Sequence, residues 1–537
     1  MKLNVGIVFA LSIVLGLADV GFAQMNPKQK LAEAITAIDL NYVDRVPEEH
    51  LTDAAILGML KVLDPHCKYY SRLEMEERKT AMSGTYAGIG IQFLIRSDTA
   101  NVTQVNDGSP AGRAGLKTGD RILAIDGKSV LGGTFSNAAI MKMIRGSAGS
   151  PLEIKIYRPE GSEQKSFSMK RAMTSDSPIK LAYMLDKQTA YIAFSIFSQT
   201  SRPEMDKALA SLKAQGMKNL ILDLQGNGGG YVQAALGIAD EFLKADKMVY
   251  YTVGADGGKD YYYTSGQGNF QQGRLAVLID NNTASASEIM TGALQDWDRA
   301  VIIGRRSFGK GLMQKPYNLS DGSVLELSGA RYYTPTERSL QKPYSEYEQD
   351  LSNRYKRGEM VDLLKIRHTD TLKKLTLIYK KPVYGGEGIT PDLFVPVDTL
   401  DSNAGLGKLF SSGAITTMSL NYAELHGNEV KSRYPTFVAY QDGFSVPEDL
   451  VANMIANTQE KLFSKNNPAS FLKLKNKVSL EAKAQIAAQL YSGSSSYAQV
   501  INSGNEVIIA AFELLTNPEE FERVLKGKRP IHNRKKQ

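Results

Sequence analysis

The chain has 537 residues, of which 42% are apolar and 23% are charged, and its formal net charge is +7. This length is too great for one hydrophobic core and predicts two to four domains. Because Cys67 is the only cysteine, an intramolecular disulfide and a cysteine-based metal site are excluded. Part of the positive charge lies in residues 526–537. We interpret this tail as solvated rather than bound to nucleic acid, with proximity to a membrane surface as the alternative.

The N-terminus has the pattern of a secretory signal peptide. Lys2 precedes an apolar run at 5–17, and small residues occupy positions 21 and 23. Such a run is short for a membrane span. We therefore expect residues 1–23 to be removed by cleavage after Ala23 and the mature protein to be periplasmic or secreted. An uncleaved N-terminal anchor is the alternative.

Residues 24–82 and 83–172 differ in the periodicity of their apolar residues. The first segment has helical stripes that begin near Leu31 and Leu51, which predict an N-terminal helical region. The second has short β-rich runs at 90–95, 121–125 and 152–157, with a hairpin signal at Asp126-Gly127. It also has one short helical stretch at 135–145. These patterns predict a separate β-rich domain.

Residues 173–400 alternate strands with amphipathic helices, which predicts an α/β core. We expect strands at 189–194, 220–224, 275–280 and 300–304, and helices at 203–214 and 232–243. We interpret a charged segment at about 343–384 as an insertion. Residues 401–537 should be mostly helical, with 457–474 and 502–517 as examples. We assign contact with an adaptor, or with a second copy in a homo-oligomer, to this last region as a hypothesis.

Ser285 lies in a loop between a buried strand and an apolar helical stripe. A serine in this position is exposed at the edge of a sheet, where the amide of Ala286 and the positive end of the helix can face a developing oxyanion. Ser285 and Glu288 also have the spacing of a capping box, so a serine that only caps the helix is the alternative. Ser287 competes with Ser285 for the role of nucleophile.

Lys310 is the candidate base for such a serine. A serine nucleophile needs a base, and none of the five histidines lies in the small-residue loops around Ser285. A lysine removed from water has a lowered pKa and can do the same work. The run Gly304-x-x-x-x-Gly309-Lys310 also resembles a phosphate-binding loop, but Gly311 stands where a magnesium-binding Ser or Thr is needed. A nucleotide site and a surface lysine are the alternatives.

Two glycine-rich stretches predict sites made of backbone amides. Gly226-Asn227-Gly228-Gly229-Gly230 follows a strand, and its spacing differs from the dinucleotide-binding pattern. We expect it to turn at a sheet edge and to offer free amides to an oxyanion. Gly88-Ile89-Gly90-Ile91 opens the β-rich domain, where such a loop can hold the terminal carboxylate of a peptide. An ordinary entry into a strand is the alternative for this second stretch.

Taken together, these motifs resemble those of the C-terminal processing peptidases, also called tail-specific proteases. The resemblance rests on Leu222-Asp223-Leu224-x-Gly226-Asn227-x-Gly229-Gly230, on Ser285-Ala286-Ser287-Glu288-Ile289, and on Phe308-Gly309-Lys310-Gly311 with Gln314. Residues 83–172 look like a PDZ domain through Gly88-Ile89-Gly90-Ile91 and the run 119–127. The motifs occur in the right order and span roughly residues 30–400.

The resemblance implies a multidomain α+β/α/β protein in which a crotonase-like ββα protease core carries an inserted PDZ domain between helical terminal regions. It implies a serine endopeptidase with Ser285 rather than Ser287 as nucleophile, Lys310 as base and Gln314 as the residue that orients the lysine. Ala286 with Gly228 or Gly229 would supply the oxyanion amides, and the choice between the glycines stays open. Gly88, Ile89, Gly90 and Ile91 would bind the C-termini of protein or peptide substrates. Neither a metal nor a cofactor is implied.

The chain also departs from the family pattern. Gln225 stands where relatives usually have arginine, and Cys67 stands where a small hydroxyl residue is common. The insertion is longer than in many relatives, and the motifs do not cover residues 401–537. A non-catalytic periplasmic PDZ scaffold that binds C-terminal peptides is the alternative function, and the presence of Ser285, Lys310 and Gln314 counts against it.

Overall fold

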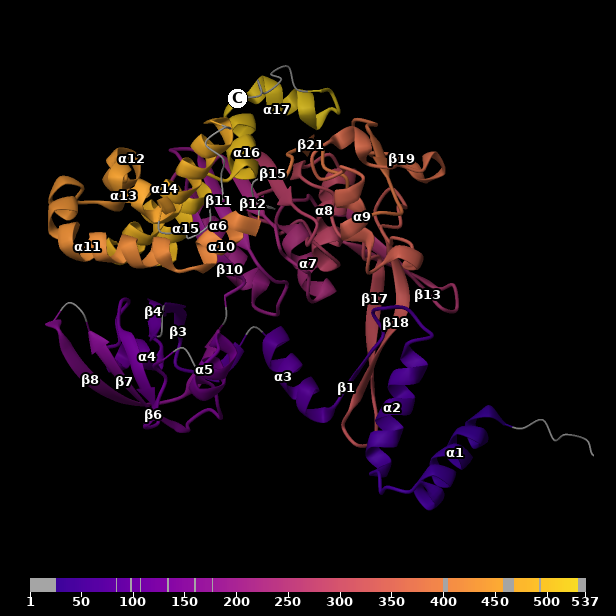
Figure 1. The fold of residues 1–537 in the computed structure, drawn as a ribbon. Coiled ribbons are helices and arrows are strands. Elements are labelled where there is room, and N and C mark those ends of the chain that lie inside the picture. The colour runs from indigo at the N-terminus through magenta and orange to yellow at the C-terminus, as the bar shows by residue number, and fades with distance from the viewer. Residues whose placement is uncertain are drawn as a thin grey trace, which may run out of the picture. The chain divides into compact units, whose positions relative to one another are not determined.

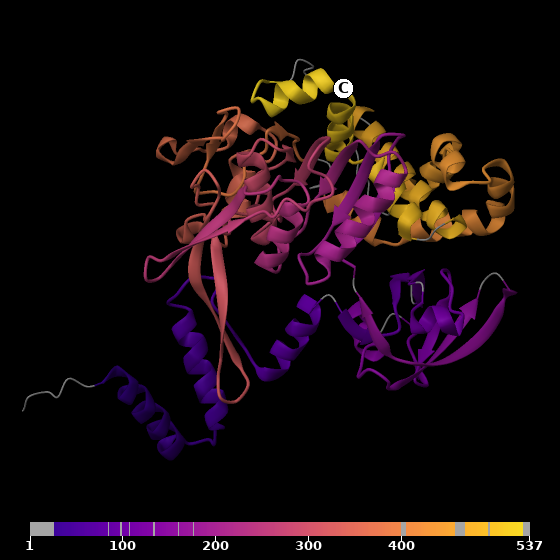
Figure 2. The same cartoon turned by 180° about the vertical axis from the view of Figure 1, so that it is seen from behind.

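The computed structural model describes residues 26–83, 85–96, 99–106, 108–132, 135–158, 161–175, 177–398, 404–456, 468–491 and 494–529. The chain divides into two compact units, Met1–Tyr69 and Tyr70–Gln537. The expected signal peptide and most of the basic tail lie outside the described residues. Figures 1 and 2 show the described elements from opposite sides.

The first unit contains two helices, α1 (Pro27–Asn41) and α2 (Glu48–Leu60). Helix α1 begins where the Asn26 side chain accepts the amide of Lys28 and Pro27 occupies the first turn, a favourable start because proline lacks an amide to satisfy. Helix α1 buries no residue and α2 buries only Leu60. These helices therefore have no hydrophobic core of their own.

The second unit begins with the end of β1 (Lys68–Tyr70) and with α3 (Arg72–Ser83), and then forms the β-rich domain. Its sheet has the strand order β3-β4-β5-β7-β8, with β6 paired to β5. The strands are β3 (Ile91–Arg96), β4 (Thr99–Val105), β5 (Arg121–Ile125), β6 (Lys128–Ser129), β7 (Pro151–Arg158) and β8 (Glu163–Lys170). The helices α4 (Pro110–Ala114) and α5 (Asn137–Ile144) complete it, and β2 (Thr85–Gly88) pairs with β9 (Ala172–Ser175) where the chain enters and leaves.

The hairpin between β5 and β6 is made by the predicted turn. Asp126 and Gly127 have φ values of 46° and 75°, the left-handed conformation that a tight hairpin requires at both positions. Apolar residues from the strands and from both helices form one cluster, which includes Ile89, Ile122, Ile140 and Ile154. This domain therefore has a core of its own.

The central sheet has the strand order β10-β11-β12-β15-β16-β21, and all pairs except β10·β11 are parallel. Its strands are β10 (Ile179–Met184), β11 (Thr189–Phe194), β12 (Asn219–Asp223), β15 (Arg274–Ile279), β16 (Val301–Gly304) and β21 (Leu393–Phe394). Every residue of β12 and β16 is buried. The continuous apolar runs in the sequence follow from this burial on both faces.

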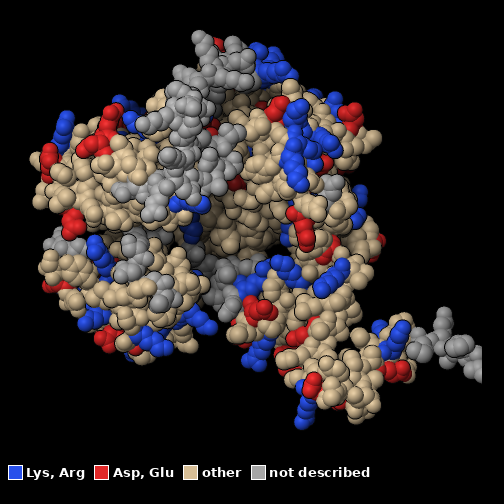
Figure 3. All heavy atoms as spheres, in the orientation of Figure 1, with Lys and Arg blue, Asp and Glu red and all other residues tan. Residues whose placement is uncertain are grey.

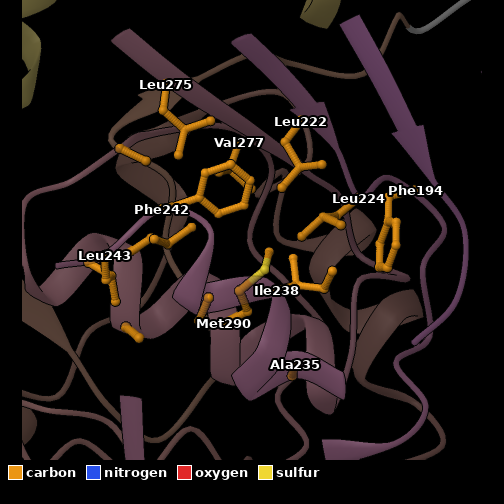
Figure 4. Close-up of a cluster of buried hydrophobic side chains, with 14 of the residues drawn as sticks. Phe194, Leu222, Leu224, Ala235, Ile238, Phe242, Leu243, Leu275, Val277 and Met290 are labelled. Carbon is orange, nitrogen blue, oxygen red and sulfur yellow. The ribbon is translucent and has the colours of Figure 1, made fainter. Parts of the chain in front are cut away.

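Two clusters of apolar side chains cover the two faces of the central sheet. One contains residues of α6 (Ser201–Ala214), α7 (Val232–Asp240) and α8 (Ala286–Asp296), and Figure 4 shows part of it, with Leu222 and Val277 of the sheet above Ile238 and Met290 of the helices. The opposite face is covered by α16 (Glu506–Thr516) and α17 (Pro518–Leu525) from the end of the chain. The last two helices are therefore part of the core domain.

A second, antiparallel sheet carries strands β13 (Met248–Gly254), β14 (Lys259–Tyr263), β17 (Leu312–Asn318) and β18 (Val324–Tyr333). Strand β17 begins two residues after Lys310. The predicted insertion contains α9 (Asp350–Lys356), short single turns of helix and the pair β19 (Lys373–Leu375) and β20 (Pro382–Tyr384). Strand β17 thus continues directly from the loop that carries Lys310, and the insertion follows β18 in the chain.

A third apolar cluster belongs to helices α10 (Ala404–Ser411), α11 (Ala414–Arg433), α12 (Phe437–Gly443), α13 (Glu448–Ala456), α14 (Pro468–Leu490) and α15 (Ser494–Asn502). The helix expected at 502–517 is found as α16, but it begins four residues later than expected, at Glu506, because α15 ends at Asn502. Asn505 caps the new helix by accepting the amides of Val507 and Ile508. The helix expected at 457–474 falls partly outside the described residues.

In the part of the chain that the structure describes, no helix combines the length and apolarity of a membrane span. On the face shown in Figure 3, basic and acidic side chains are interspersed among uncharged surface.

Candidate active site

The predicted site residues lie in three loops that follow neighbouring parallel strands. Residues 224–231 follow β12, residues 280–285 follow β15 and residues 305–311 follow β16. Because the carboxyl ends of parallel strands meet at one edge of a sheet, the three loops lie together, as ligand-binding loops do in open α/β sheets. The site is therefore assembled from segments that are far apart in the sequence.

Ser285 has a strained backbone at the N-cap of α8. Its φ is 58° and its ψ is −118°, which is outside the left-handed helical region that a non-glycine residue adopts most easily. Strain of this kind costs of order 1–3 kcal/mol and persists only where neighbours fix it. Here the neighbours are the buried helix α8 and the loop after β12. Ser285 itself is partly exposed.

Ser287, the competing serine, is fully buried. Its hydroxyl donates to the carbonyl oxygen of Asn227 at 2.9 Å. The same carbonyl accepts the amide of Ala284 at 3.0 Å. Ser287 therefore ties the start of α8 to the glycine-rich loop, which leaves Ser285 as the serine that a ligand can reach.

The carboxylate of Glu288 joins the serine loop to the lysine loop. Its Oε2 accepts the amide of Ser285 at 2.9 Å and the amide of Lys310 at 2.8 Å. Its Oε1 accepts the amide of Gly309 at 2.7 Å and the hydroxyl of Ser307 at 2.5 Å. Burial raises the pKa of Glu288, and these four donors oppose that rise by stabilising its charge. One buried side chain thus brings the backbones of Ser285 and Lys310 together.

Tyr332 makes a second connection between the same two residues. Its hydroxyl donates to the carbonyl oxygen of Lys310 and lies 3.4 Å from the carbonyl oxygen of Ser285. The side chain is buried, and burial followed by the nearby charge of Glu288 holds the pKa of this phenol well above its usual range. Tyr332 therefore remains a hydrogen-bond donor. Both the amides and the carbonyls of Ser285 and Lys310 are thus bridged.

Gly229 packs against Ser285 so closely that a side chain could not fit. A Cβ at this position would lie 2.9 Å from the Ser285 Cβ and 2.9 Å from the Ala286 nitrogen, and the φ of Gly229 is 100°. The amide of Gly229 donates to the Asn227 Oδ1 at 2.9 Å. Gly228 is exposed, and its amide has no acceptor among the described residues. The structure thus brings Ser285, Ala286 and the two candidate glycines together.

Lys310 and Gln314 lie on either side of the start of β17. Lys310 is partly buried, and its loop is also tied to the serine loop where the Phe308 amide donates to the Thr283 carbonyl at 2.9 Å. Gln314 stands opposite Ser328 on β18, and its Nε2 donates to the Ser328 hydroxyl at 3.3 Å. Gln314 therefore lies four residues after Lys310, within the first residues of strand β17.

The predicted peptide-binding loop is held by its carbonyl groups. Gly88 ends β2, and the Ile89 and Gly90 carbonyls accept the amides of Ala111 and Asn106 at 3.0 Å and 2.9 Å. Gly90 has a φ of 74°, and a Cβ there would lie 2.4 Å from the Ser109 Cβ. Ile91 begins β3. The loop is thus fixed through its oxygen atoms at the entrance of the first strand of this sheet.

Sequence reasoning identified Glu288 only as a partner in a capping box and did not identify Tyr332 as a site residue. The signal for Glu288 was present, since Ser-x-x-Glu predicts the contact with the Ser285 amide. Its bonds to Ser307, Gly309 and Lys310 depend on tertiary structure. Among the described residues, no group of three or more potential metal-ligating side chains is present.

Comparison with known proteins assigns families to three parts of the chain. Residues 188–350 match peptidase family S41, residues 102–158 match the PDZ domain, and residues 406–493 match a family of unknown function. The S41 match contains Ser285 and Lys310, and the PDZ match lies within the β-rich domain.

Two curated relatives cover a large part of the chain. A carboxy-terminal-processing protease of Bartonella bacilliformis is 30% identical over 61% of this chain and 76% of its own length. The carboxy-terminal processing protease CtpB of Bacillus subtilis is 32% identical over 58% of this chain, and the match spans 65% of the relative's length. A solved photosystem II D1 C-terminal processing protease is 26% identical, with a TM-score of 0.36, over 69% of this chain and 94% of its own.

The chain belongs to the carboxy-terminal processing proteases, which are serine-type peptidases of family S41, and it carries a PDZ domain. The resemblance stated from the motifs is thereby confirmed.

Proposed function

We propose that the protein is an exported serine endopeptidase that hydrolyses peptide bonds with a Ser285–Lys310 dyad. One observation carries the proposal: Glu288 and Tyr332 bridge the backbones of a partly exposed, strained serine and of a lysine. No histidine lies within the three loops that form the site. Lys310 is the only lysine in these loops and is the proposed base towards Ser285.

In the proposed reaction, the neutral amine of Lys310 accepts the proton of the Ser285 hydroxyl as its oxygen attacks the carbonyl carbon of the substrate. The resulting oxyanion receives hydrogen bonds from the Ala286 amide and from the Gly228 amide. Gly228 is preferred to Gly229, because Gly229 already donates to Asn227. Lys310 then gives the proton to the leaving amine, which leaves an acyl-enzyme.

A water molecule hydrolyses the acyl-enzyme after losing its proton to the same lysine. Gln314 is assigned the role of orienting Lys310 through its position at the start of β17. The crotonase-like ββα arrangement of the core stays a prediction, and the reaction as written uses no metal or cofactor.

The PDZ domain is proposed to capture the C-termini of protein substrates. The fixed loop from Gly88 to Ile91 and the adjoining strand β3 would bind the terminal carboxylate and extend the sheet. Two relatives are named as carboxy-terminal processing proteases, which supports substrates of this class. Export to the periplasm or beyond is proposed from the N-terminal sequence pattern, with cleavage after Ala23.

The experiment compares the purified wild type with Ser285→Ala and Lys310→Ala on a denatured protein with a free or a blocked C-terminus. We expect both substitutions to reduce cleavage to background, and wild-type activity to fall in acid as the lysine base becomes protonated. Cleavage by both variants would disprove the dyad. Equal cleavage of free and blocked substrates would disprove capture by the PDZ domain, and binding without turnover by the wild type would support the scaffold instead.

A further inference from the structure

Arg354, in helix α9 of the 343–384 insertion, is bound to the loop that carries Lys310. Its Nη1 donates to the carbonyl oxygens of Arg306 at 3.1 Å and Ser307 at 2.9 Å, and its Nη2 donates to that of Phe308 at 3.4 Å. The Arg354 side chain is only 1% exposed. One buried guanidinium thus holds three consecutive peptide groups that end two residues before Lys310.

Acidic side chains fix Arg354 in this position. Asp350, one turn earlier in α9, lies 3.0 Å from the Arg354 Nη2. Glu359 lies 3.9 Å from its Nε and accepts two hydrogen bonds from Arg306 at 2.6 Å and 2.9 Å. Arg306 also donates to the carboxylate of Glu387 at 2.6 Å. Because breaking a buried ion pair leaves an uncompensated charge, this network resists movement of the loop.

The rest of the lysine loop is held by residues outside it. The Gly309 carbonyl accepts the amide of Lys342 at 3.0 Å, and the Gly311 amide donates to the Gln341 Oε1 at 2.8 Å. With the bonds from Glu288 and Tyr332, each residue from 306 to 311 has a backbone group bound by a partner outside the loop. The loop belongs to no helix or strand from 305 to 311. Its conformation therefore depends on these partners.

We propose that Arg354 is a positioning residue for Lys310, and that the insertion orders the lysine loop for catalysis. A base held in the geometry of attack loses little freedom in the transition state, and a small displacement costs a large factor in rate. The role of Arg354 rests on the proposed dyad. The ordering of the loop by the insertion does not rest on it, since it follows from hydrogen bonds within the chain.

The test uses Arg354→Met, which keeps the length of the side chain and removes the guanidinium, and Arg354→Lys, which keeps the charge but cannot hold three carbonyls. Lys356→Met is the matched control, because Lys356 is an exposed basic residue two positions later in the same helix. Steady-state cleavage of a denatured protein and amide hydrogen exchange of residues 305–311 are measured on the full chain, well below each variant's melting temperature.

We expect Arg354→Met to lower kcat by about 10-fold or more with KM changed less than 2-fold, and to speed exchange of the loop amides by about 10-fold. Arg354→Lys should lie between it and the wild type, and Lys356→Met should match the wild type. If Arg354→Met does not fold, the kcat and the amide exchange of Arg354→Lys test the proposal in its place. Unchanged exchange overturns the ordering of the loop. Faster exchange with unchanged kcat in an active, Ser285-dependent enzyme overturns the positioning role.

A wild type without Ser285-dependent cleavage would instead remove the proposed function. The exchange measurement would still decide whether the insertion orders the loop.

Discussion

The serine loop and the lysine loop are fixed in different ways. The serine loop is fixed mainly by backbone strain and close packing: Ser285 is strained, helix α8 is buried along its whole length, and Gly229 of the neighbouring loop packs against the Ser285 Cβ. The Glu288 carboxylate adds one hydrogen bond from the Ser285 amide. The lysine loop has no strain at Lys310 and no regular structure. It is held by side chains from α8, from β18 and from the insertion.

The difference shows that a catalytic pair can be ordered by local geometry on one side and by long-range hydrogen bonds on the other. Changes around Ser285 should act through steric fit. Changes around Lys310 should act through the loss of hydrogen bonds, and single bonds should matter less because the loop has several. Three substitutions test this contrast, and a fourth tests a buried carboxyl group beside the serine loop.

Gly229→Ala disturbs the steric fit around Ser285 and should have the largest effect of these substitutions. A Cβ at 2.9 Å from Ser285 and a φ of 100° force the serine loop to move. We expect kcat to fall by about 100-fold, as for a displacement near 1 Å. Gly237→Ala in α7 is the control, since its Cβ would meet only Arg202 at an ordinary 3.7 Å. Full activity in Gly229→Ala would show that the serine loop is not fixed by this contact.

Glu288→Gln weakens the hydrogen bonds through which Glu288 joins the serine loop to the lysine loop. The amide nitrogen of Gln would face amide donors, and up to four hydrogen bonds to a charged group would be weakened. Since such bonds contribute about 1.5–3 kcal/mol each and are not additive, we expect a loss of about 3 kcal/mol in the free energy of unfolding. Denaturant unfolding measures it, with the exposed Glu424→Gln as control. An unchanged midpoint would contradict the bridge.

Asp223→Asn tests a carboxyl group beside the serine loop that does not take part in the bridge. Burial raises the pKa of Asp223 to about 6 from an ordinary 3.8, against the opposing bonds from Tyr191 and Gln225. Between these values the folded chain holds a proton that the unfolded chain has released, so stability increases as pH falls through 6. The variant should lose this rise, which is at most about 3 kcal/mol between pH 8 and pH 4. Unfolding curves of the wild type and of Asp223→Asn at both pH values measure this difference. Equal pH dependence of stability in the two proteins would contradict a raised pKa of Asp223.

Tyr332→Phe removes one bond of the lysine loop and should have the smallest effect. The loss of the hydroxyl leaves the Lys310 carbonyl without this donor, at a cost of about 1 kcal/mol. Because Glu288 and Arg354 still hold the loop, we expect kcat to fall less than in Gly229→Ala. Tyr317→Phe, on the exposed part of β17, is the control. A drop as large as that of Gly229→Ala would show that the lysine loop depends on a single contact.

Some elements could be predicted from the sequence because their burial leaves a continuous apolar run. The strand at 189–194 is found at those residues, and the strands expected at 220–224 and 275–280 are each shifted by one residue. The helix expected at 502–517 is present as α16, but its start was placed four residues too early. Gly504 and Asn505 carried the signal for a break, but the apolar residues around them continue the helical period. Packing decides this break, since a Cβ at Gly504 would lie 2.3 Å from Leu480.

The sequence by itself determined the chemical groups of the site, their order and the strands that they follow. Parallel strands place the loops after them at one edge, so the meeting of the glycine, serine and lysine loops was predictable. Only the tertiary structure decided that Glu288 joins Ser285 to Lys310, that Ser287 is buried, and that Arg354 binds the lysine loop. A hydrogen bond across 22 or 47 residues has no periodicity to reveal it, because it depends on how separate elements pack.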